Sequence, residues 1–259
     1  MKVAAYQMPV GACYSGDPVA HLNARVRECE RAGVRLLCCP EGALGGLADY
    51  LDAPDDIAIA ADLDVIATHL LPLASQSVTI VVGFTERDTS GRYYNAAAVY
   101  SDGAVIGINR KHHPAIRRSR YSPGTGAPVF KVCGTVIGVL ICRDSTDAQL
   151  ARTLVDQGAQ VLCVPTNNAM PPDRSGSHLV NDVRALDAQL AATLGVPIIR
   201  ADVVGDTRGL ASAGASMITD PSGRQLSARG AEEGELIMAE LSSGVGASPS
   251  PCLHRCALL

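Results

Sequence analysis

The chain contains no tryptophan, and aromatic residues occupy only 3% of its 259 positions. Its core must therefore be built from Ala, Val, Leu and Ile, and the 47% share of hydrophobic residues is large enough for a sizeable one. No apolar run reaches 18 residues, so the sequence predicts no membrane span. A formal net charge of −4 gives no general attraction to nucleic acid or anionic lipid, and we expect neither as a partner.

The nine cysteines include no Cys-x-x-Cys pair. Their odd number and irregular spacing are not typical of a disulfide framework. Four of them fall in predicted apolar strands, namely Cys38, Cys39, Cys133 and Cys163. Cysteine used as a small hydrophobe indicates a reducing compartment. The N-terminal residues 1–9 are too short and polar for a signal peptide and fit a strand, so we expect a cytoplasmic protein.

No cofactor or metal site is predicted. The sequence has no Gly-x-Gly-x-x-Gly fingerprint and no P-loop. Cys252, His254 and Cys256 have the residue types of metal ligands, but a complete site needs a fourth ligand in a folded context. Their neighbours, residues 248–251, alternate Ser and Pro and indicate a mobile segment.

Strand-like and helix-like segments alternate along the chain, with short hairpin turns between some strands. Helices are expected over about 18–31, 54–73, 146–157 and 178–194. Strands are expected near 3–8, 36–39, 78–84, 94–100, 104–108, 128–132, 135–141, 160–165, 196–200, 213–219, 225–229 and 235–241. Such alternation predicts an α/β fold with mixed sheets covered by helices. We expect one domain over 1–241 and a Ser/Gly/Pro-rich, flexible tail over 242–259.

Three of the predicted strands lead directly to a reactive polar residue. The run 36–40 precedes Glu41, the run 104–110 precedes Lys111, and the run 136–141 precedes Cys142. A side chain just beyond a buried strand lies at the rim of the sheet, where a nucleophile must be to meet its substrate. A carboxylate, an ammonium and a thiol in this order indicate amide chemistry by covalent catalysis.

These three groups have complementary roles in cleaving an amide. A free thiol has a pKa of about 8.5, so we expect Glu41 to accept the Cys142 proton while the Lys111 cation favours the thiolate. Lys111 and the backbone N–H of Arg143 are the expected oxyanion donors, each typically worth about 3–4 kcal/mol of barrier. Glu41 would then protonate the departing amine, and water would release the acid from an acyl-Cys142 thioester.

Four short motifs resemble the nitrilase superfamily of carbon–nitrogen hydrolases. They are Cys39-Pro40-Glu41-Gly42, Asn109-Arg110-Lys111, Arg120-Tyr121-Ser122-Pro123-Gly124 and Leu140-Ile141-Cys142-Arg143-Asp144. The resemblance covers nearly the whole chain, from 3–8 to 213–223. It implies a four-layer α-β-β-α sandwich, catalysis by Glu41, Lys111 and Cys142, and pairing of helical faces into a homodimer or a multiple of dimers.

The chain departs from the family pattern in one loop. Family members commonly carry a second glutamate between the lysine and the cysteine, whereas residues 112–141 contain no Asp or Glu. Arg120 matches a family arginine and is expected to be structural. Arg117 and Arg118 lie in a loop that the family places over the active-site mouth, so they are candidates for binding an anionic substrate. The alternative is a solvated loop or a subunit contact.

The sequence also suggests roles for other polar residues near the motifs. Asn167 and Asn168 follow the strand 160–165 and are expected to line the substrate pocket. Asp144 is expected to be a helix cap or a structural partner. His112 and His113 are expected to be exposed, although a Cys–His dyad is the alternative.

The sequence thus predicts an amidase-type hydrolase for a small carboxamide or an N-carbamoyl compound. Each of the three residues, taken singly, also has a non-catalytic interpretation. Cys142 could be a core cysteine, Glu41 a solvated loop acid and Lys111 a surface lysine. One alternative function is a catalytically degenerate family member that acts as a binding or scaffold subunit. Another is a class I glutaminase, but its nucleophile elbow favours a small residue where Ile141 and Arg143 stand.

Overall fold

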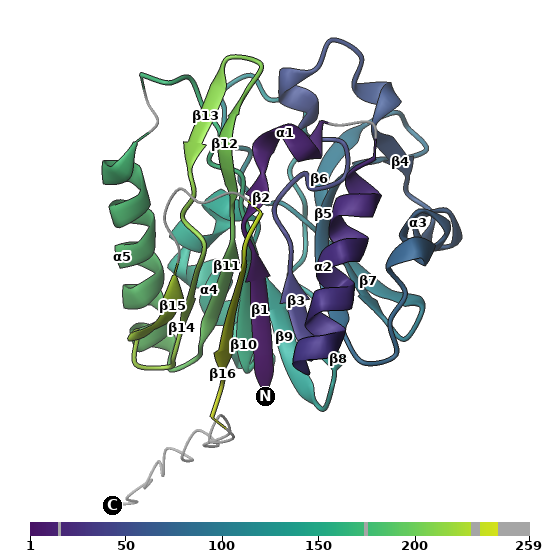
Figure 1. The fold of residues 1–259 in the computed structure, drawn as a ribbon. Helices are drawn as coiled ribbons and strands as arrows, with labels where there is room; N and C mark the ends of the chain where they lie inside the picture. The colour runs from purple at the N-terminus through teal and green to yellow at the C-terminus, as the bar shows by residue number, and fades with distance from the viewer. Residues whose placement is uncertain (15–16, 174–175, 229–233, 243–259) are drawn as a thin grey trace, which may run out of the picture.

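The computed structural model describes residues 1–14, 17–173, 176–228 and 234–242. Two large sheets lie face to face, and helices cover the outer side of each (Figure 1). The predicted α-β-β-α sandwich is confirmed. Of the tail expected over 242–259, residues 243–259, with Cys252 and Cys256, lie outside the described residues. No helix among the described residues is long and apolar enough to cross a membrane.

The first sheet has seven strands in the described chain, in the order β16-β1-β3-β5-β6-β7, with β4 pairing with β5. Their bounds are β1 Lys2–Tyr6, β3 Leu36–Cys38, β4 Ala58–Ala60, β5 Thr79–Arg87, β6 Tyr93–Ser101, β7 Ala104–Arg110 and β16 Leu236–Glu240. Strands β1, β3 and β5 are parallel, and β7 shares their direction because β6 is antiparallel to both β5 and β7.

The second sheet has six strands in the described chain, in the order β15-β14-β11-β10-β9-β8. Their bounds are β8 Val129–Val132, β9 Thr135–Val139, β10 Val161–Pro165, β11 Ile198–Ala201, β14 Met217–Thr219 and β15 Gln225–Ala228. Strands β9, β10 and β11 are parallel. A small third sheet, β13-β12-β2, joins β2 Met8–Pro9 to the hairpin of β12 Val203–Thr207 and β13 Leu210–Ala213.

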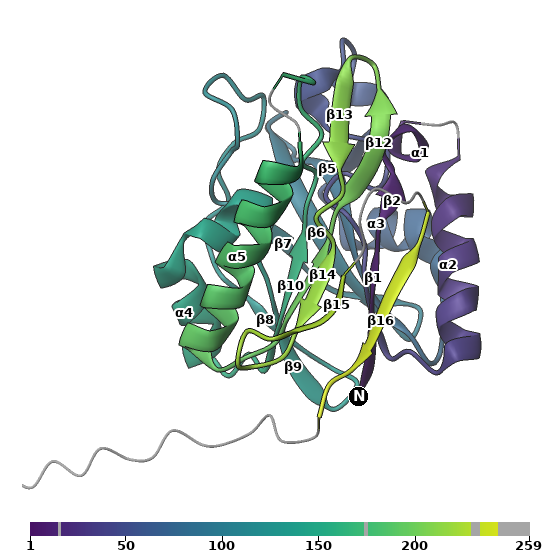
Figure 2. The ribbon, with the colours of Figure 1, turned by 60° about the vertical axis from the view of Figure 1, so that its left-hand side comes forward.

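Two helices cover each outer face of the sandwich (Figure 2). Helices α2 Pro18–Ala32 and α3 Leu63–Leu70 pack on the first sheet, and α4 Ala148–Asp156 and α5 Ser177–Leu194 pack on the second. The short helix α1 Val10–Cys13 follows β2. Helices α2 and α5 end at the glycines that the sequence indicated, Gly33 and Gly195, both left-handed.

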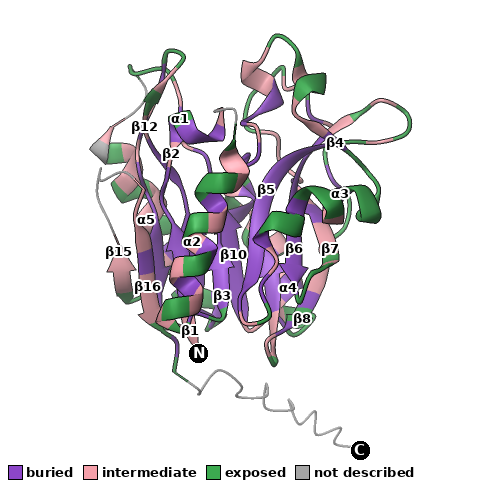
Figure 3. Ribbon diagram, turned by 45° about the vertical axis from the view of Figure 1, so that its right-hand side comes forward, coloured by how far each residue is buried: buried purple, intermediate pink, exposed green. Residues whose placement is uncertain are grey.

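The sandwich holds three apolar layers. One lies under α2 and α3, one between the two sheets, and one under α4 and α5. The strands are mostly buried, whereas the helices show an exposed outer face (Figure 3). In the layer between the sheets, Val81 and Cys38 of the first sheet pack with Val139 and Cys163 of the second.

Three sequence predictions were wrong in detail. The expected helix over 54–73 is divided into the 3-10 turn Pro54–Asp56, strand β4 and helix α3. The hairpin β12–β13 was not predicted. In the structure, Arg208 and Gly209 form its turn with positive φ angles of 52° and 76°. Cys133 lies in the turn between β8 and β9, where it is half-buried, and not inside a strand.

Candidate active site

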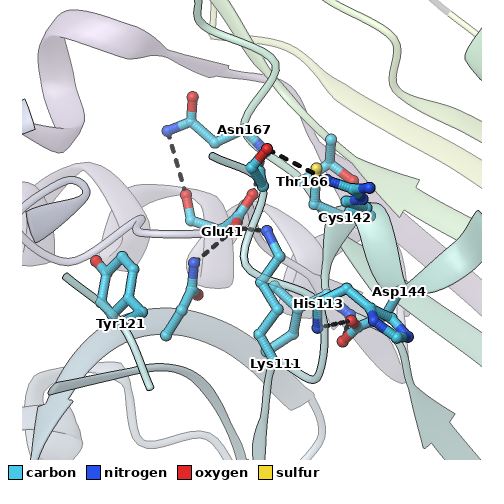
Figure 4. A network of polar contacts seen from close by, with 12 residues as sticks. Glu41, Lys111, His113, Tyr121, Cys142, Asp144, Thr166 and Asn167 are labelled. Carbon is cyan, nitrogen blue, oxygen red and sulfur yellow. Dashed lines mark hydrogen bonds and ion pairs between the residues drawn. The ribbon is translucent and has the colours of Figure 1, made fainter. Parts of the chain in front are cut away.

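The carboxyl ends of strands from both sheets meet at one rim of the sandwich. Glu41 follows β3, and Lys111 follows β7 in the first sheet. Cys142 follows β9, and Asn167 follows β10 in the second sheet. The structure therefore brings together residues that lie up to 126 positions apart (Figure 4).

Glu41 is 2% exposed and every part of its carboxylate is engaged. Oε1 accepts from Lys111 Nζ at 2.5 Å and from Asn95 Nδ2 at 2.6 Å, and Oε2 accepts from the Asn167 backbone N–H at 3.0 Å. Charge-assisted hydrogen bonds of this kind fix the side chain firmly. The carboxylate is thus oriented before any substrate arrives.

A close backbone approach sets the position of the Glu41 segment. This segment continues beside strand β5, and the N–H of Gly83 in β5 donates to the Pro40 carbonyl at 3.2 Å. A Cβ at Gly83 would lie 2.5 Å from that carbonyl oxygen and 2.7 Å from Glu41 Cα. Only glycine allows the two segments to approach so closely.

Lys111 is 4% exposed and forms a buried ion pair with Glu41. Burial alone would lower the pKa of Lys111, but the neighbouring Glu41 carboxylate outweighs burial, so the pKa is raised. Lys111 is therefore charged throughout the neutral range. A fixed ammonium at this point can stabilise negative charge that develops on a substrate oxygen.

Cys142 begins a 3-10 helix, Cys142–Thr146, and has a positive φ of 49°. A non-glycine residue in this region is strained, and such strain is typical of functional turns. The first intrahelical bond runs from Asp144 N–H to the Ile141 carbonyl at 3.0 Å. The N–H of Arg143 precedes that bond, so the helix itself does not use it.

The thiol of Cys142 is protonated in the free site. Burial raises the pKa of Cys142 to about 12, and the Glu41 carboxylate adds to the effect, while Lys111 and Arg200 only partly oppose it. Lys111 lowers the pKa of Cys142, which is the direction expected from the sequence, but burial and the Glu41 carboxylate outweigh it. A base must take the proton during the attack itself.

Asp144 connects the Lys111 segment to the turn that carries Cys142. Its buried carboxylate accepts from the backbone N–H groups of His112, His113 and Ile141, with distances of 2.8–3.3 Å. Burial raises the pKa of Asp144, although these hydrogen bonds oppose the shift. The prediction that Asp144 is a structural partner is confirmed, since it joins strand ends of the two sheets.

Asn168 and Asp202 lie behind the thiol. The Cys142 sulfur is 4.0 Å from Asn168 Oδ1, which is long but within range for a weak thiol donor. The buried Asp202 carboxylate accepts from both the backbone and the side-chain amide of Asn168, at 3.0 and 2.9 Å. Asp202 therefore turns the Asn168 oxygen toward Cys142.

Arg200 supports the same strand ends from within the second sheet. It is 2% exposed and pairs in a bidentate manner with Asp187 of α5, at 2.5 and 2.7 Å. It also donates to the Thr166 hydroxyl at 2.5 Å and to the Ser145 hydroxyl at 2.8 Å. One guanidinium thus joins the β10 end to the turn that carries Cys142.

A cavity of about 40 Å³ opens beside Glu41 and Lys111. A cavity of this size has room for at least one water molecule. Its other lining residues are Leu47, Asp49, Tyr50, Asn95, Pro114, Ala115, Ile116, Tyr121 and Asn167. Cys142 lies outside this lining, on the side of Asn168.

Asp49 is a second carboxylate in the lining of the cavity. It lies outside residues 112–141, the segment that contains no Asp or Glu. It accepts from the Ser119 hydroxyl at 2.9 Å and from the Arg120 backbone N–H at 2.6 Å. The loop that follows Lys111 is thereby attached to the 3-10 turn Ala48–Tyr50.

The predicted substrate-binding residues fall into two groups, apart from Asn168, which does not line the cavity and whose side-chain amide donates to Asp202 instead. Asn167 lines the cavity, but its side chain bonds inward to the Glu41 carbonyl and to the Ala169 N–H. Arg117, Arg118 and Arg143 are exposed, and none of them forms an ion pair within the described chain. Arg143 Nη1 lies 3.4 Å from the carbonyl of Ala115, a cavity residue.

The two histidines beside Lys111 bond away from the thiol. His112 Nε2 lies 2.6 Å from the Gly126 carbonyl, and His113 Nε2 lies 2.9 Å from Asp147 Oδ2. Neither geometry supports a Cys–His dyad.

Sequence reasoning missed Asn95, Asp49, Asp202 and Arg200. A signal existed for Asn95, which is a polar residue within the apolar run 94–100. Arg200 stands likewise at the end of an apolar strand. Asp49 had no such signal, because it lies in an irregular segment.

An α-β-β-α sandwich with a carboxylate, an ammonium and a thiol at one rim defines the class of carbon–nitrogen hydrolases. The profile of the Carbon-nitrogen hydrolase family matches residues 2–249, and the chain belongs to this family and to the nitrilase superfamily.

Among curated proteins, the chain is 30% identical to a nitrilase of Pyrococcus abyssi, over 93% of this chain and 89% of that protein. It is 32% identical to an (R)-stereoselective amidase of Pseudomonas sp., over 76% of this chain and 70% of that protein. It is 31% identical to the glutamine-dependent NAD(+) synthetase of Xylella fastidiosa over 86% of this chain, which spans only 41% of that protein.

Solved structures share the fold. Nit3 of Saccharomyces cerevisiae has a TM-score of 0.77 at 24% identity, covering 95% of this chain and 91% of that one. An amidase of Nesterenkonia sp. has a TM-score of 0.76 at 22% identity, covering 93% and 90%.

Proposed function

We propose that the protein hydrolyses the C–N bond of a small carboxamide or N-carbamoyl compound through an acyl-Cys142 thioester. The observation that carries the proposal is the buried, fully oriented Glu41–Lys111 pair, which lines a small cavity at the rim of the sandwich. Amidase and N-carbamoylputrescine amidase relatives support this reaction class.

Glu41 is the proposed general base and acid. Because the pKa of Cys142 is raised, the thiol has to lose its proton to Glu41 as the sulfur attacks the carbonyl carbon. The proton then passes from Glu41 to the amide nitrogen as the C–N bond breaks. Water activated by the same carboxylate hydrolyses the thioester.

Lys111 and the Arg143 N–H are the proposed donors to the tetrahedral oxyanion. The Glu41 carboxylate that binds Lys111 also accepts hydrogen bonds from Asn95 and from the Asn167 backbone. Because these bonds fix the ion pair in place, little reorganisation is needed during the reaction. No metal or cofactor enters this scheme.

The exposed guanidiniums favour a substrate with a carboxylate. Arg143 contacts the loop that lines the cavity, and Arg117 and Arg118 are in the same loop. Arginine binds carboxylate in a bidentate manner. Glutamine and N-carbamoyl amino acids are therefore included among the test substrates, and the synthetase relatives named for glutamine also support glutamine.

The test is ammonia release from a panel of neutral and carboxylate-bearing amides of equal size, with Cys142→Ala as the inactive control. The double variant Arg117→Ala/Arg118→Ala should raise KM for the anionic amides by roughly tenfold or more and leave neutral amides unchanged. Equal losses for both classes would assign these arginines to folding or assembly. If the wild-type protein releases ammonia from none of the amides, the degenerate binding or scaffold subunit becomes the better account.

A further inference from the structure

Tyr50 is the last residue of the 3-10 turn Ala48–Tyr50, and it lines the cavity together with Glu41 and Lys111. Its side chain is half-buried. The phenol is close enough to Glu41, Lys111 and Cys142 for their charges to act on its pKa. The Tyr50 side chain therefore reaches the surroundings of the catalytic residues.

The Tyr50 hydroxyl differs from the other polar groups in the cavity wall. Each of the others already forms a side-chain hydrogen bond within the protein, namely Glu41, Asp49, Asn95, Lys111, Tyr121 and Asn167. The Tyr50 hydroxyl forms none with any described residue, and its oxygen keeps some accessible surface. Tyr50 thus has a hydroxyl that is available to a ligand.

This hydroxyl keeps its proton under ordinary conditions. Burial raises the pKa of Tyr50, and the Asp49 and Glu41 carboxylates add to the effect, while Lys111 opposes it. The phenol is therefore neutral at neutral and mildly alkaline pH. A neutral hydroxyl can both donate and accept hydrogen bonds.

The cavity favours a small group that carries N–H donors. Its volume is about 40 Å³, far below the roughly 300–1,000 Å³ of sites for drug-sized ligands. Its wall holds two carboxylates, Glu41 and Asp49, against the one ammonium of Lys111. Carboxylates attract polar hydrogens, and an unsubstituted –CO–NH2 end is a small group that brings them.

We propose that Tyr50 is a substrate-binding residue whose hydroxyl oxygen accepts a hydrogen bond from the terminal NH2 group of the substrate. This inference rests on the proposed function and narrows it to substrates with an unsubstituted amide end. Primary carboxamides and N-carbamoyl compounds both carry such an end.

The nitrogen in the cavity is then the leaving group, and the product is ammonia and not an amine. The Cys142 proton passes to Glu41 as the S–C bond forms, and Glu41 transfers it to this nitrogen as the C–N bond breaks. Tyr50 exchanges no proton in these steps. It binds the group that leaves.

A thermodynamic cycle of protein and ligand variants isolates this contact. The ligands are propanamide and butanone, which carry NH2 and CH3, respectively, on the same carbonyl group. The proteins are Cys142→Ala and Cys142→Ala/Tyr50→Phe, since neither ligand can react without the thiol. Tyr50→Phe removes only a hydroxyl and leaves every hydrogen bond of the Glu41 carboxylate in place.

We expect Tyr50→Phe to weaken propanamide binding by about tenfold in an NMR titration and to leave butanone binding unchanged. Tyr121→Phe in the same Cys142→Ala protein is the matched control. Tyr121 lines the same cavity, but its hydroxyl already bonds the Thr85 hydroxyl and the Ala48 N–H. Any loss of affinity in this control should be equal for the two ligands.

Equal losses for both ligands in the Tyr50 variant would overturn the inference and assign the hydroxyl to the shared carbonyl oxygen or to the turn. Unchanged binding of both ligands would overturn it as well. Amide hydrolysis by the wild-type protein would support the proposed function in either case. A wild-type protein that releases ammonia from no amide would instead contradict the proposed function, so the two failures are distinguishable.

Discussion

At the scale of single residues, the Glu41–Lys111 pair combines chemistry with stability. Removing one partner of a buried ion pair leaves an uncompensated charge, whereas replacing both partners by neutral residues is often tolerated. Lys111→Ala should therefore lower the free energy of unfolding by about 3–5 kcal/mol, and Glu41→Gln/Lys111→Met should recover most of this loss in urea denaturation.

Catalysis should respond differently from stability. Both Glu41→Gln and the double variant remove the base, so single-turnover acylation should fall by roughly 10²-fold or more in each. A double variant that regains activity together with stability would show that His112 or His113 carries the proton instead.

The Cys142 thiol gives a second test at this scale. Because its pKa is raised to about 12, the thiolate fraction should grow with pH throughout the neutral and mildly alkaline range. Alkylation of Cys142 by iodoacetamide should therefore rise by about tenfold per pH unit between pH 7 and 10, without a plateau. Peptide mapping at each pH provides the rates, and a plateau below pH 9 would contradict the raised pKa.

The cysteines must be distinguished in that experiment. Cys38, Cys39 and Cys163 are buried and should react slowly, but Cys133 is half-buried like Cys142. A bound substrate should protect Cys142 and leave the reaction of Cys133 unchanged.

At the scale of elements, the close approach of β5 to the Glu41 segment at Gly83 is sensitive to one added methyl group. Gly83→Ala would force backbone atoms apart, since all three nearest contacts, at 2.5–2.7 Å, are backbone atoms. We expect a loss of about 1–3 kcal/mol of stability and a fall in kcat of roughly 10²-fold, because Glu41 is displaced.

Gly11→Ala is the matched control for this substitution. A Cβ at Gly11 meets nothing within 4 Å, and its φ is not positive. Unchanged kcat in Gly83→Ala, with the stability loss as expected, would show that the Glu41 segment adjusts without moving its carboxylate.

Sequence periodicity predicts elements that carry their own start and stop signals. Helix α2 was predicted because Asp17 caps it, Pro18 opens it and Gly33 ends it. The expected helix over 54–73 was wrong because residues 58–60 pair with the C-terminal end of β5, and Asp62 then caps α3. Pairing between distant segments leaves no mark in local spacing.

The same distinction holds for the active site. Glu41, Lys111 and Cys142 follow their strands directly, so the sequence indicates their positions at the rim. Asn95 and Asp202 act through partners 54 and 34 positions away, which only the assembled sheets bring near. From the sequence alone, these two residues could not be distinguished from ordinary polar residues in or beside strands.

At the scale of the whole molecule, we predict a homodimer through the helical face of α4 and α5. This face carries Leu186, which is 46% exposed. Light scattering should give twice the 26.9 kDa chain mass, and Leu186→Glu should shift the protein to the monomer. Leu71→Glu is the control, because Leu71 is 63% exposed on the opposite helical side. Dissociation by the control alone would place the interface there.

The thickness of the sandwich has a consequence for chemistry. The base and the ammonium follow strands of one sheet and the thiol follows a strand of the other, and an apolar layer of residues such as Val81 and Val139 separates the two sheets. Face-to-face sheets lie about 10 Å apart, and their separation depends on the size of the side chains between them. This layer therefore influences the distance over which the proton passes between Cys142 and Glu41. A methyl group added to or removed from this layer, far from the rim, can therefore change that distance and lower the reaction rate while the protein remains folded.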